Sequence, residues 1–186
     1  MASDVIMTNN IQGGYSATEH LIRHGFGKIA IIAGPLSIST GKDRMIGYKR
    51  ALEDYGITEL EELIKVGEFT TESGYNKMKE LMNQKTKPEA VFISNNSMTL
   101  GAYKYLKDSQ IAIPDEVAIF GYDDPDWADV VDPPISTVIP RTAAERCLQP
   151  TKRIKESSPT HWQEWANATR KSPSSSTAFY CLLEGN

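Results

Sequence analysis

The fold is decided by the stretch Val117-Ala-Ile-Phe-Gly-Tyr-Asp-Asp124. Its first four residues are apolar, which is typical of a strand buried on both faces of a parallel sheet. Gly121 then lets the backbone turn, and two carboxylates follow where the strand should end. In open α/β sheets, ligands bind in the crevice beyond the carboxyl ends of the strands. The stretch therefore predicts either a ligand-binding carboxylate at Asp123 or, because Asp favours turns, an ordinary loop corner.

Length and charge limit the classes of protein that this chain can form. Its 186 residues carry a net charge of −4, with both signs mixed along the sequence, whereas nucleic-acid-binding domains usually present a basic face. No apolar run approaches the roughly 18 residues of a membrane helix, and the first residues lack the regions of a secretory signal. We therefore expect a cytoplasmic protein with no membrane partner.

Apolar runs alternate with helical periodicities along most of the chain. The strands are expected at residues 4–8, 29–33, 63–66, 90–93, 117–120 and 136–139. The helices are expected from about 15 to 24, from a cap at Ser39 or Thr40 to about 55, at 71–83 and at 97–108. This alternation, with single helices as connections, predicts a doubly wound, mainly parallel α/β sheet with helices on both faces.

The pattern changes near Pro140. From residue 141 to residue 186, charges, serines and prolines alternate with isolated large side chains, and we find neither a clear strand nor a sustained helical period. Such a segment buries too little apolar surface to offset the entropy of ordering. We therefore divide the chain into a folded domain, residues 1–140, and an irregular or disordered tail, residues 141–186.

Polar and aromatic residues follow several of the predicted strands. Phe69, Asn95 and Asp123 each follow one strand, while Thr40 and Arg44 open the helix after the strand at 29–33. Because the carboxyl ends of parallel strands meet at one edge, these residues are expected to form a small-molecule site there. The alternatives are an exposed charge for Arg44, helix caps for Thr40 and Asn95, and core packing for Phe69.

Catalytic and metal sites have less support. His20 and His24 stand four residues apart on a predicted helix, but the pattern places no third ligand near them and their charged neighbours indicate a solvated face. The stretch 34–41 superficially resembles a phosphate loop, but it lacks the final Gly-Lys-Ser/Thr, and no Gly-x-Ser-x-Gly turn occurs. We expect no metal, no cofactor and no enzymatic activity.

A set of short motifs occurs in order between about Val5 and Arg141: Gly14-Tyr15, Ile31-Ile-Ala-Gly-Pro35, Arg44-x-x-Gly47-Tyr48, Ser73-Gly74-Tyr75, Pro114-x-x-Val117, Gly121-Tyr-Asp-Asp124 and Pro133-Pro-Ile-Ser-Thr-Val138. Together they resemble the effector-binding domain of the lactose/galactose-repressor (LacI/GalR) family of transcriptional regulators. The resemblance implies one lobe of a two-lobed domain like that of periplasmic sugar-binding proteins, with a sugar, a purine or a similar small effector between the lobes.

The resemblance also assigns roles to the candidate residues. It implies that Arg44 and Asp123 are the main polar ligands of the effector, that Asn95 assists them and that Phe69 stacks on the effector. Thr40 and Ile38 would lie on the loop that varies with the effector. The resemblance implies that relatives dimerise partly through the C-terminal lobe. In this chain the helix at 97–108 and the segment 127–134 would supply that surface, so a homodimer is expected.

The leading hypothesis is therefore the effector-sensing lobe of a LacI-type regulator. The chain begins near the entry to the C-terminal lobe, so we expect it to be truncated and to reach DNA only through a helix-turn-helix headpiece that is absent from this sequence. One alternative is the sugar-binding component of a transport system, which shares the fold. Another is a small α/β enzyme with Asp123 as general base, although no second acid, base or nucleophile is placed beside it.

Overall fold

The structure, a computed structural model, describes residues 9–123, 127, 130–138 and 154–155. The strands are β1 (Ile29–Ala33), β2 (Ile64–Val66), β3 (Ala90–Ile93), β4 (Ala118–Tyr122), β5 (Ser136–Val138) and β6 (Ile154–Lys155). The helices are α1 (Asn10–Arg23), α2 (Ser39–Asp54), α3 (Thr71–Asn83) and α4 (Asn96–Asp108), with a 3₁₀ turn, η1 (Glu61–Leu63), before β2. The strand expected at residues 4–8 lies outside the described residues.

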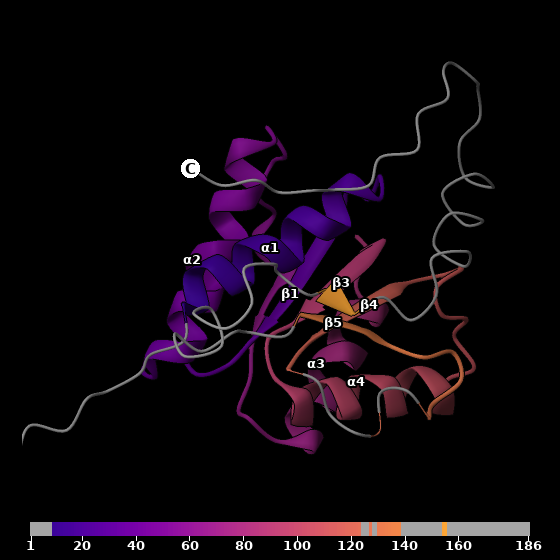
Figure 1. Cartoon of the computed structure of the whole chain (residues 1–186). Coiled ribbons are helices and arrows are strands. Elements are labelled where there is room, and N and C mark those ends of the chain that lie inside the picture. The colour runs from indigo at the N-terminus through magenta and orange to yellow at the C-terminus, as the bar shows by residue number, and fades with distance from the viewer. Residues whose placement is uncertain (1–8, 124–126, 128–129, 139–153, 156–186) are drawn as a thin grey trace, which may run out of the picture.

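The strands form one sheet in the order β2-β1-β3-β4-β5-β6. The pairs from β2 to β5 are parallel, and β6 pairs antiparallel with β5. Every residue of β1, β3 and β4 is buried, which explains their continuous apolar runs in the sequence. Helices α1 and α2 cover one face, and α3 and α4 cover the other (Figure 1). The predicted doubly wound α/β fold is confirmed.

Alternation along the central strands builds a core on each face of the sheet. Phe92 and Phe120 point toward α1 and α2 and pack in a cluster with Tyr48. Their neighbours Val91 and Ile119 belong to the opposite cluster, beneath α3 and α4. Because successive side chains of a strand point to opposite faces, the same short apolar runs supply both cores.

Two helix starts differ from the sequence prediction. Helix α1 begins at Asn10, so Gly13 and Gly14 lie inside it rather than before it. Helix α2 has Ile38 at its N-cap position with no side-chain cap hydrogen bond, and Ser39 is its first helical residue. The capping role predicted for Ser39 or Thr40 is therefore wrong, because the N-cap residue Ile38 has no side-chain oxygen to accept from the first N–H groups of the helix.

Glycines set the close approach of the helices on each face. A Cβ added at Gly14 would overlap the carbonyl of Arg44, and one added at Gly47 would overlap the backbone of α1. The same relation holds on the other face, where Gly74 lies against the backbone of Met98 and Gly101 against that of α3. Backbone therefore meets backbone at both crossings, which is the reason that Gly is found inside these helices despite its low helix propensity.

The predicted tail is described only at Ile154–Lys155. These two residues form β6, which the sequence pattern did not indicate, and they pair with Thr137 and Val138 of β5. The rest of 141–186 lies outside the described residues, so the division at residue 140 stays a prediction. None of the helices in the described ranges is both long enough and apolar enough to span a membrane.

The α1–α2 crossing yields a stability prediction. Gly→Ala in a helix normally gains about 1 kcal/mol in propensity, but at Gly47 the new Cβ would overlap backbone atoms that cannot rotate away. Gly47→Ala should therefore lower the free energy of unfolding by about 1–3 kcal/mol, the usual cost of overpacking. Urea denaturation followed by circular dichroism measures this change.

Gly27→Ala is the matched control, because a Cβ at Gly27 meets only the Glu89 carboxylate, at 3.8 Å. It should change stability by less than about 0.5 kcal/mol. A Gly47→Ala protein that is as stable as the wild type would show that the helix crossing is looser than described.

Candidate small-molecule site

The candidate site lies where the direction of chain winding reverses. From β1 the chain passes through α2 to β2 on one side, and from β3 it continues through α4 to β4 on the other. The carboxyl ends of β1 and β3 therefore form the edge at which sheets of this kind usually bind ligands. Gly34 follows β1 and Ser94 follows β3, and the Gly34 N–H donates to Ser94 Oγ at 3.0 Å between the two strand ends.

Arg44 is buried at this position, with only 8% of its surface exposed. Its Nε donates to Asn10 Oδ1 at 3.1 Å, and its Nη1 donates to the carbonyl of Ser94. The guanidinium carbon lies 3.5 Å from the centroid of the Tyr122 ring. The alternative of an exposed helix charge is therefore wrong. Among the described residues Arg44 makes no ion pair, so its direct contacts are with neutral groups.

Asp123 follows β4 in a left-handed backbone conformation, with φ at +72°. Positive φ is uncommon outside Gly, although Asp tolerates it better than most residues. Its N–H donates to the Val138 carbonyl at 3.0 Å, which fixes the corner between β4 and β5. Burial raises the pKa of the half-buried carboxyl, and the charge of Arg44 partly opposes that rise. Asp123 is thus a turn residue whose carboxylate is poorly solvated.

Asn95 is the N-cap residue of α4, which is the alternative role that the sequence predicted for it. Its Oδ1 accepts from the N–H groups of Ser97, at 3.0 Å, and Met98, at 3.3 Å. Within the described part of the chain its side-chain nitrogen makes no hydrogen bond. The Asn95 side chain therefore caps the helix through its oxygen and still has an N–H₂ donor at the carboxyl end of β3.

Phe69 follows β2 and lies across the end of β1. Its ring occupies the position where a Cβ of Gly34 would stand, so the absence of a side chain at Gly34 makes room for it. The ring is half-buried and also packs against the α3–α4 core. Phe69 thus combines the predicted core role with an aromatic surface at the edge where Arg44 lies.

Ile38 and Thr40 stand at the start of α2. Ile38 is 44% exposed, and Thr40 is half-buried one turn before Arg44. Neither side chain hydrogen-bonds to Arg44 or Asp123 in the described ranges. The structure places both residues at the carboxyl edge of the sheet without bringing them into the buried polar group.

The sequence prediction missed three members of this group: Asn10, Ser94 and Tyr122. Tyr122 belongs to the stretch 117–124. The alternation of side chains along a strand would have placed its side chain on the opposite face of the sheet from position 121. Ser94 directly follows an apolar strand, as Asn95 was noted to do. No sequence signal identified Asn10, because its partners lie 34 and 112 residues away.

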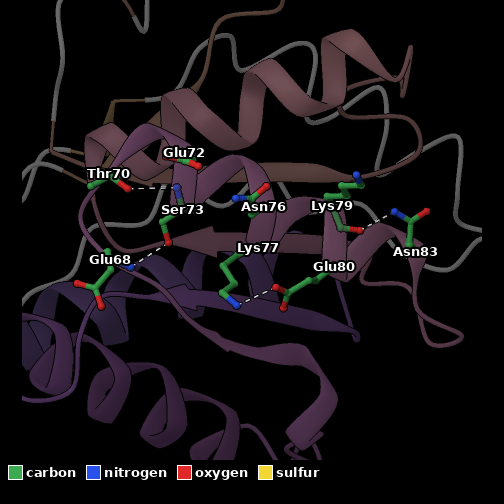
Figure 2. A pocket seen from close by; sticks show the side chains of 9 residues that line it. All are labelled: Glu68, Thr70, Glu72, Ser73, Asn76, Lys77, Lys79, Glu80 and Asn83. Carbon is green, nitrogen blue, oxygen red and sulfur yellow. Dashed lines mark hydrogen bonds and ion pairs between the residues drawn. The ribbon is translucent and has the colours of Figure 1, made fainter.

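A shallow hollow along α3 offers a second surface, shown in Figure 2. It is lined by polar and charged residues: Glu68, Thr70, Glu72, Ser73, Asn76, Lys77, Lys79, Glu80 and Asn83. Lys77 and Glu80 form an ion pair of 2.8 Å here, and the Glu68 N–H donates to Ser73 Oγ. Such mutually satisfied charges are typical of a solvated helix face. We therefore regard the hollow as a weaker candidate for a binding site than the carboxyl edge of the sheet.

The histidine pair on α1 differs from its predicted solvated face. His20 is buried, with 7% exposure, and its ring centroid lies 4.9 Å from that of Phe120 and 4.1 Å from that of His24. Burial, aided by His24, lowers the pKa of His20 to about 3, so its ring is neutral near pH 7. No group of three or more His, Cys, Asp or Glu within the described residues is arranged to hold a metal ion.

Comparison with known proteins finds a matching domain family and several sequence relatives. The model of the periplasmic binding protein-like domain family matches residues 18–145. Over 136 residues, the chain is 34% identical to the ribose operon repressor of Escherichia coli K12 and 39% identical to the transcriptional repressor PurR of Proteus mirabilis. These alignments cover 73% of this chain but only 41% and 40% of those proteins. The chain thus spans about two fifths of the curated relatives it matches.

Solved structures agree with the sequence relatives. A sugar-binding transcriptional regulator of the LacI family from Escherichia coli, complexed with phosphate, superposes with a TM-score of 0.69 at 33% identity, over 72% of this chain and 48% of that one. A complex of the transcriptional regulator CelR with cellobiose superposes with a TM-score of 0.68 at 39% identity, over 71% of this chain and 40% of the regulator.

The raised pKa of Asp123 predicts how its removal changes stability. An acid whose pKa is raised on folding favours the folded state below its unfolded pKa, near 3.8, and this contribution is lost as pH rises through the folded value. At pH 7 the ionised carboxylate therefore opposes folding. Asp123→Asn, which also tolerates positive φ, should raise the free energy of unfolding at pH 7 by up to about 1 kcal/mol. This gain should shrink below about pH 4.

Chemical denaturation at pH 7 and pH 3.5 measures both values. Asp115→Asn, at an exposed position, is the control and should change stability by less than about 0.5 kcal/mol. A loss of about 1 kcal/mol in Asp123→Asn at pH 7, as expected when a turn hydrogen bond is removed, would contradict the prediction.

Proposed function

The chain belongs to the periplasmic binding protein-like domain family, and from this premise we propose that it is the effector-sensing lobe of a LacI-type transcriptional regulator. Its curated relatives are repressors rather than enzymes. The proposed activity is therefore reversible binding of a small molecule, without catalysis. The observation that carries the proposal is Arg44, a buried cation at the sheet's switch point that makes no ion pair among the described residues.

The chemistry of the edge favours a small ligand rich in hydroxyl or ring N–H groups. Arg44 and the Asn95 amide are donors, the Asp123 carboxylate is an acceptor, and Phe69 offers an apolar ring face. Sugars combine vicinal hydroxyls with an apolar C–H face, and nucleobases combine ring N–H groups with a flat surface. We propose a sugar or a nucleobase-like compound as the effector, with Ile38 and Thr40 bordering it from the start of α2.

The proposed mechanism is thermodynamic linkage. A ligand that binds one arrangement of two lobes more tightly shifts the population toward that arrangement, and it thereby changes affinity at a distant DNA site. In this proposal the lobe described here supplies one wall of the effector site. DNA binding belongs to a headpiece outside this sequence, and the regulator works in the cytoplasm, where its operator lies. A transport component would share the fold, but the relatives' repressor names favour regulation.

A titration of the purified chain tests the effector site. We expect D-ribose, cellobiose or adenine to bind, as measured by isothermal calorimetry. Arg44→Lys and Asp123→Ala should each weaken that binding by about 10- to 100-fold, because loss of a charge-assisted hydrogen bond costs about 1.5–3 kcal/mol.

Lys77→Ala, on the hollow of α3, is the matched control and should leave the affinity unchanged. Binding that Lys77→Ala weakens, while Arg44→Lys does not, would move the site to α3 and refute the proposal. So would the absence of binding by all three compounds.

We further propose that two copies of the chain pair through α4 and the segment beside it. Tyr103 Oη and Lys107 Nζ both donate to the carbonyl of Asp132, at 2.9 and 3.1 Å, which holds that segment against α4. Val130 on the same segment is 81% exposed, next to the half-buried Trp127. Exposed apolar side chains of this kind favour association.

Light scattering across a hundredfold range of concentration should show a dimer, and Val130→Ser should shift the protein toward monomer. Val66→Ser is the control. Val66 is also exposed, at 41%, but it lies on β2, at the far edge of the sheet from the segment that carries Val130. A wild-type chain that stays monomeric at all concentrations would exclude this interface.

A further inference from the structure

Tyr122 and Asp123 are neighbours in the sequence but have different surroundings at the end of β4. The Tyr122 side chain is fully buried in the α1–α2 core, and its hydroxyl lies where a Cβ of Gly13 would stand. Asp123 follows the strand at the corner toward β5, where its backbone N–H donates to the carbonyl of Val138. The tyrosine therefore has no place in the ligand site itself, although its ring face meets the guanidinium of Arg44.

Three contacts determine the orientation of that guanidinium. The Tyr122 ring, 3.5 Å from the guanidinium carbon, limits its tilt. Asn10 Oδ1 and the Ser94 carbonyl accept from Nε and Nη1, and these two bonds fix its rotation. Asn10 Oδ1 lies 3.4 Å from Tyr122 Oη as well, so the orienting groups also hold each other. An arginine has five N–H donors, and only two are used in these bonds.

These three contacts orient the guanidinium through neutral groups, although its charge also acts on the Asp123 carboxyl. Burial of an ion is costly unless a counter-ion or strong hydrogen bonds compensate it, and fully buried arginines are normally paired. In the described ranges Arg44 has a carbonyl, an amide oxygen and a ring as partners, and no carboxylate within ion-pair distance. A purely structural arginine would gain little from this arrangement, whereas a ligand-binding arginine needs both a fixed direction and an available charge.

We propose that Tyr122 and Asn10 are positioning residues, which hold the Arg44 guanidinium in the orientation that binds the effector. The inference rests on the proposed function, because it takes Arg44 as an effector ligand. It gives the Gly121-Tyr-Asp-Asp124 stretch two roles in the proposed site: Asp123 contacts the effector, and Tyr122 orients the arginine that also contacts it.

The orientation can be tested without any ligand, by ¹⁵N NMR of the Arg44 Nε–H signal in the full chain. The signal is assigned by its loss in Arg44→Lys. We expect it to be displaced from the other arginines by the ring current of Tyr122, and to exchange slowly with water because Asn10 accepts its proton. Tyr122→Leu should return the signal to the common arginine region, and Asn10→Ala should speed its exchange at least tenfold.

The second arm measures affinity for D-ribose, cellobiose and adenine by calorimetry. Tyr122→Leu should weaken the binding about tenfold or more, the equivalent of a desolvated cation–π contact. Tyr122→Phe, which keeps the ring face, should recover most of that loss. Tyr48→Phe is the structural control: Tyr48 is equally buried, one turn after Arg44 on α2, and donates to the Ile29 carbonyl. It should lower thermal stability without changing affinity or the Arg44 signal.

The outcomes separate the two proposals. A displaced signal that collapses in Tyr122→Leu, without binding of any compound to the wild type, would support the orienting role and count against the proposed function. An Arg44 signal that is unchanged in both Tyr122→Leu and Asn10→Ala would overturn the positioning role. So would Tyr122→Phe and Tyr122→Leu proteins with equal affinity, or a Tyr48→Phe protein that loses as much affinity as Tyr122→Leu.

Discussion

The carboxyl edge of this sheet is organised around one constraint, the burial of a guanidinium that makes no ion pair among the described residues. Arg44 meets that constraint by contacts with three separate elements: the start of α1 through Asn10, the end of β3 through Ser94 and the end of β4 through Tyr122. Each contact depends on how closely the elements approach. Gly14 lets α1 rest on the carbonyl of Arg44, and Asn10 lies one turn before Gly14, so the same crossing brings its amide within reach of the Arg44 side chain.

Several apolar side chains are exposed along the edge of the sheet at which Arg44 lies. Leu36 and Ile38, in the loop after β1, and Val66, at the end of β2, are 43%, 44% and 41% exposed. These apolar side chains stand at the carboxyl ends of neighbouring strands, on the same edge as Phe69. In the proposed two-lobed domain this edge would face the effector and the second lobe. Burial there would offset the cost of exposing these side chains in the lobe alone.

Much of the fold could be predicted from the sequence, because parallel strands buried on both faces leave continuous apolar runs. The boundaries of α3 and β3 matched the pattern, as did the order of helices and strands from α1 to β5. The start of α1 did not, since glycines usually end a helix, and only the contact with α2 explains why Gly13 and Gly14 lie within one. The edge of the sheet at which the candidate residues lie was predictable from topology. The partners of Arg44 were not, because they depend on tertiary contacts such as the one that brings Asn10 beside it.

The central claim is that this edge, and not another surface, binds the effector. The most direct test is a ¹H–¹⁵N NMR titration of the full chain with D-ribose, cellobiose and adenine, followed at three positions. One of the compounds should shift the Arg44 Nε–H and the Asp123 amide signals to saturation, while the Lys77 amide in the hollow of α3 stays in place. Saturable shifts confined to Lys77 and its neighbours, or no shift of Arg44 and Asp123 with any of the three, would contradict the account.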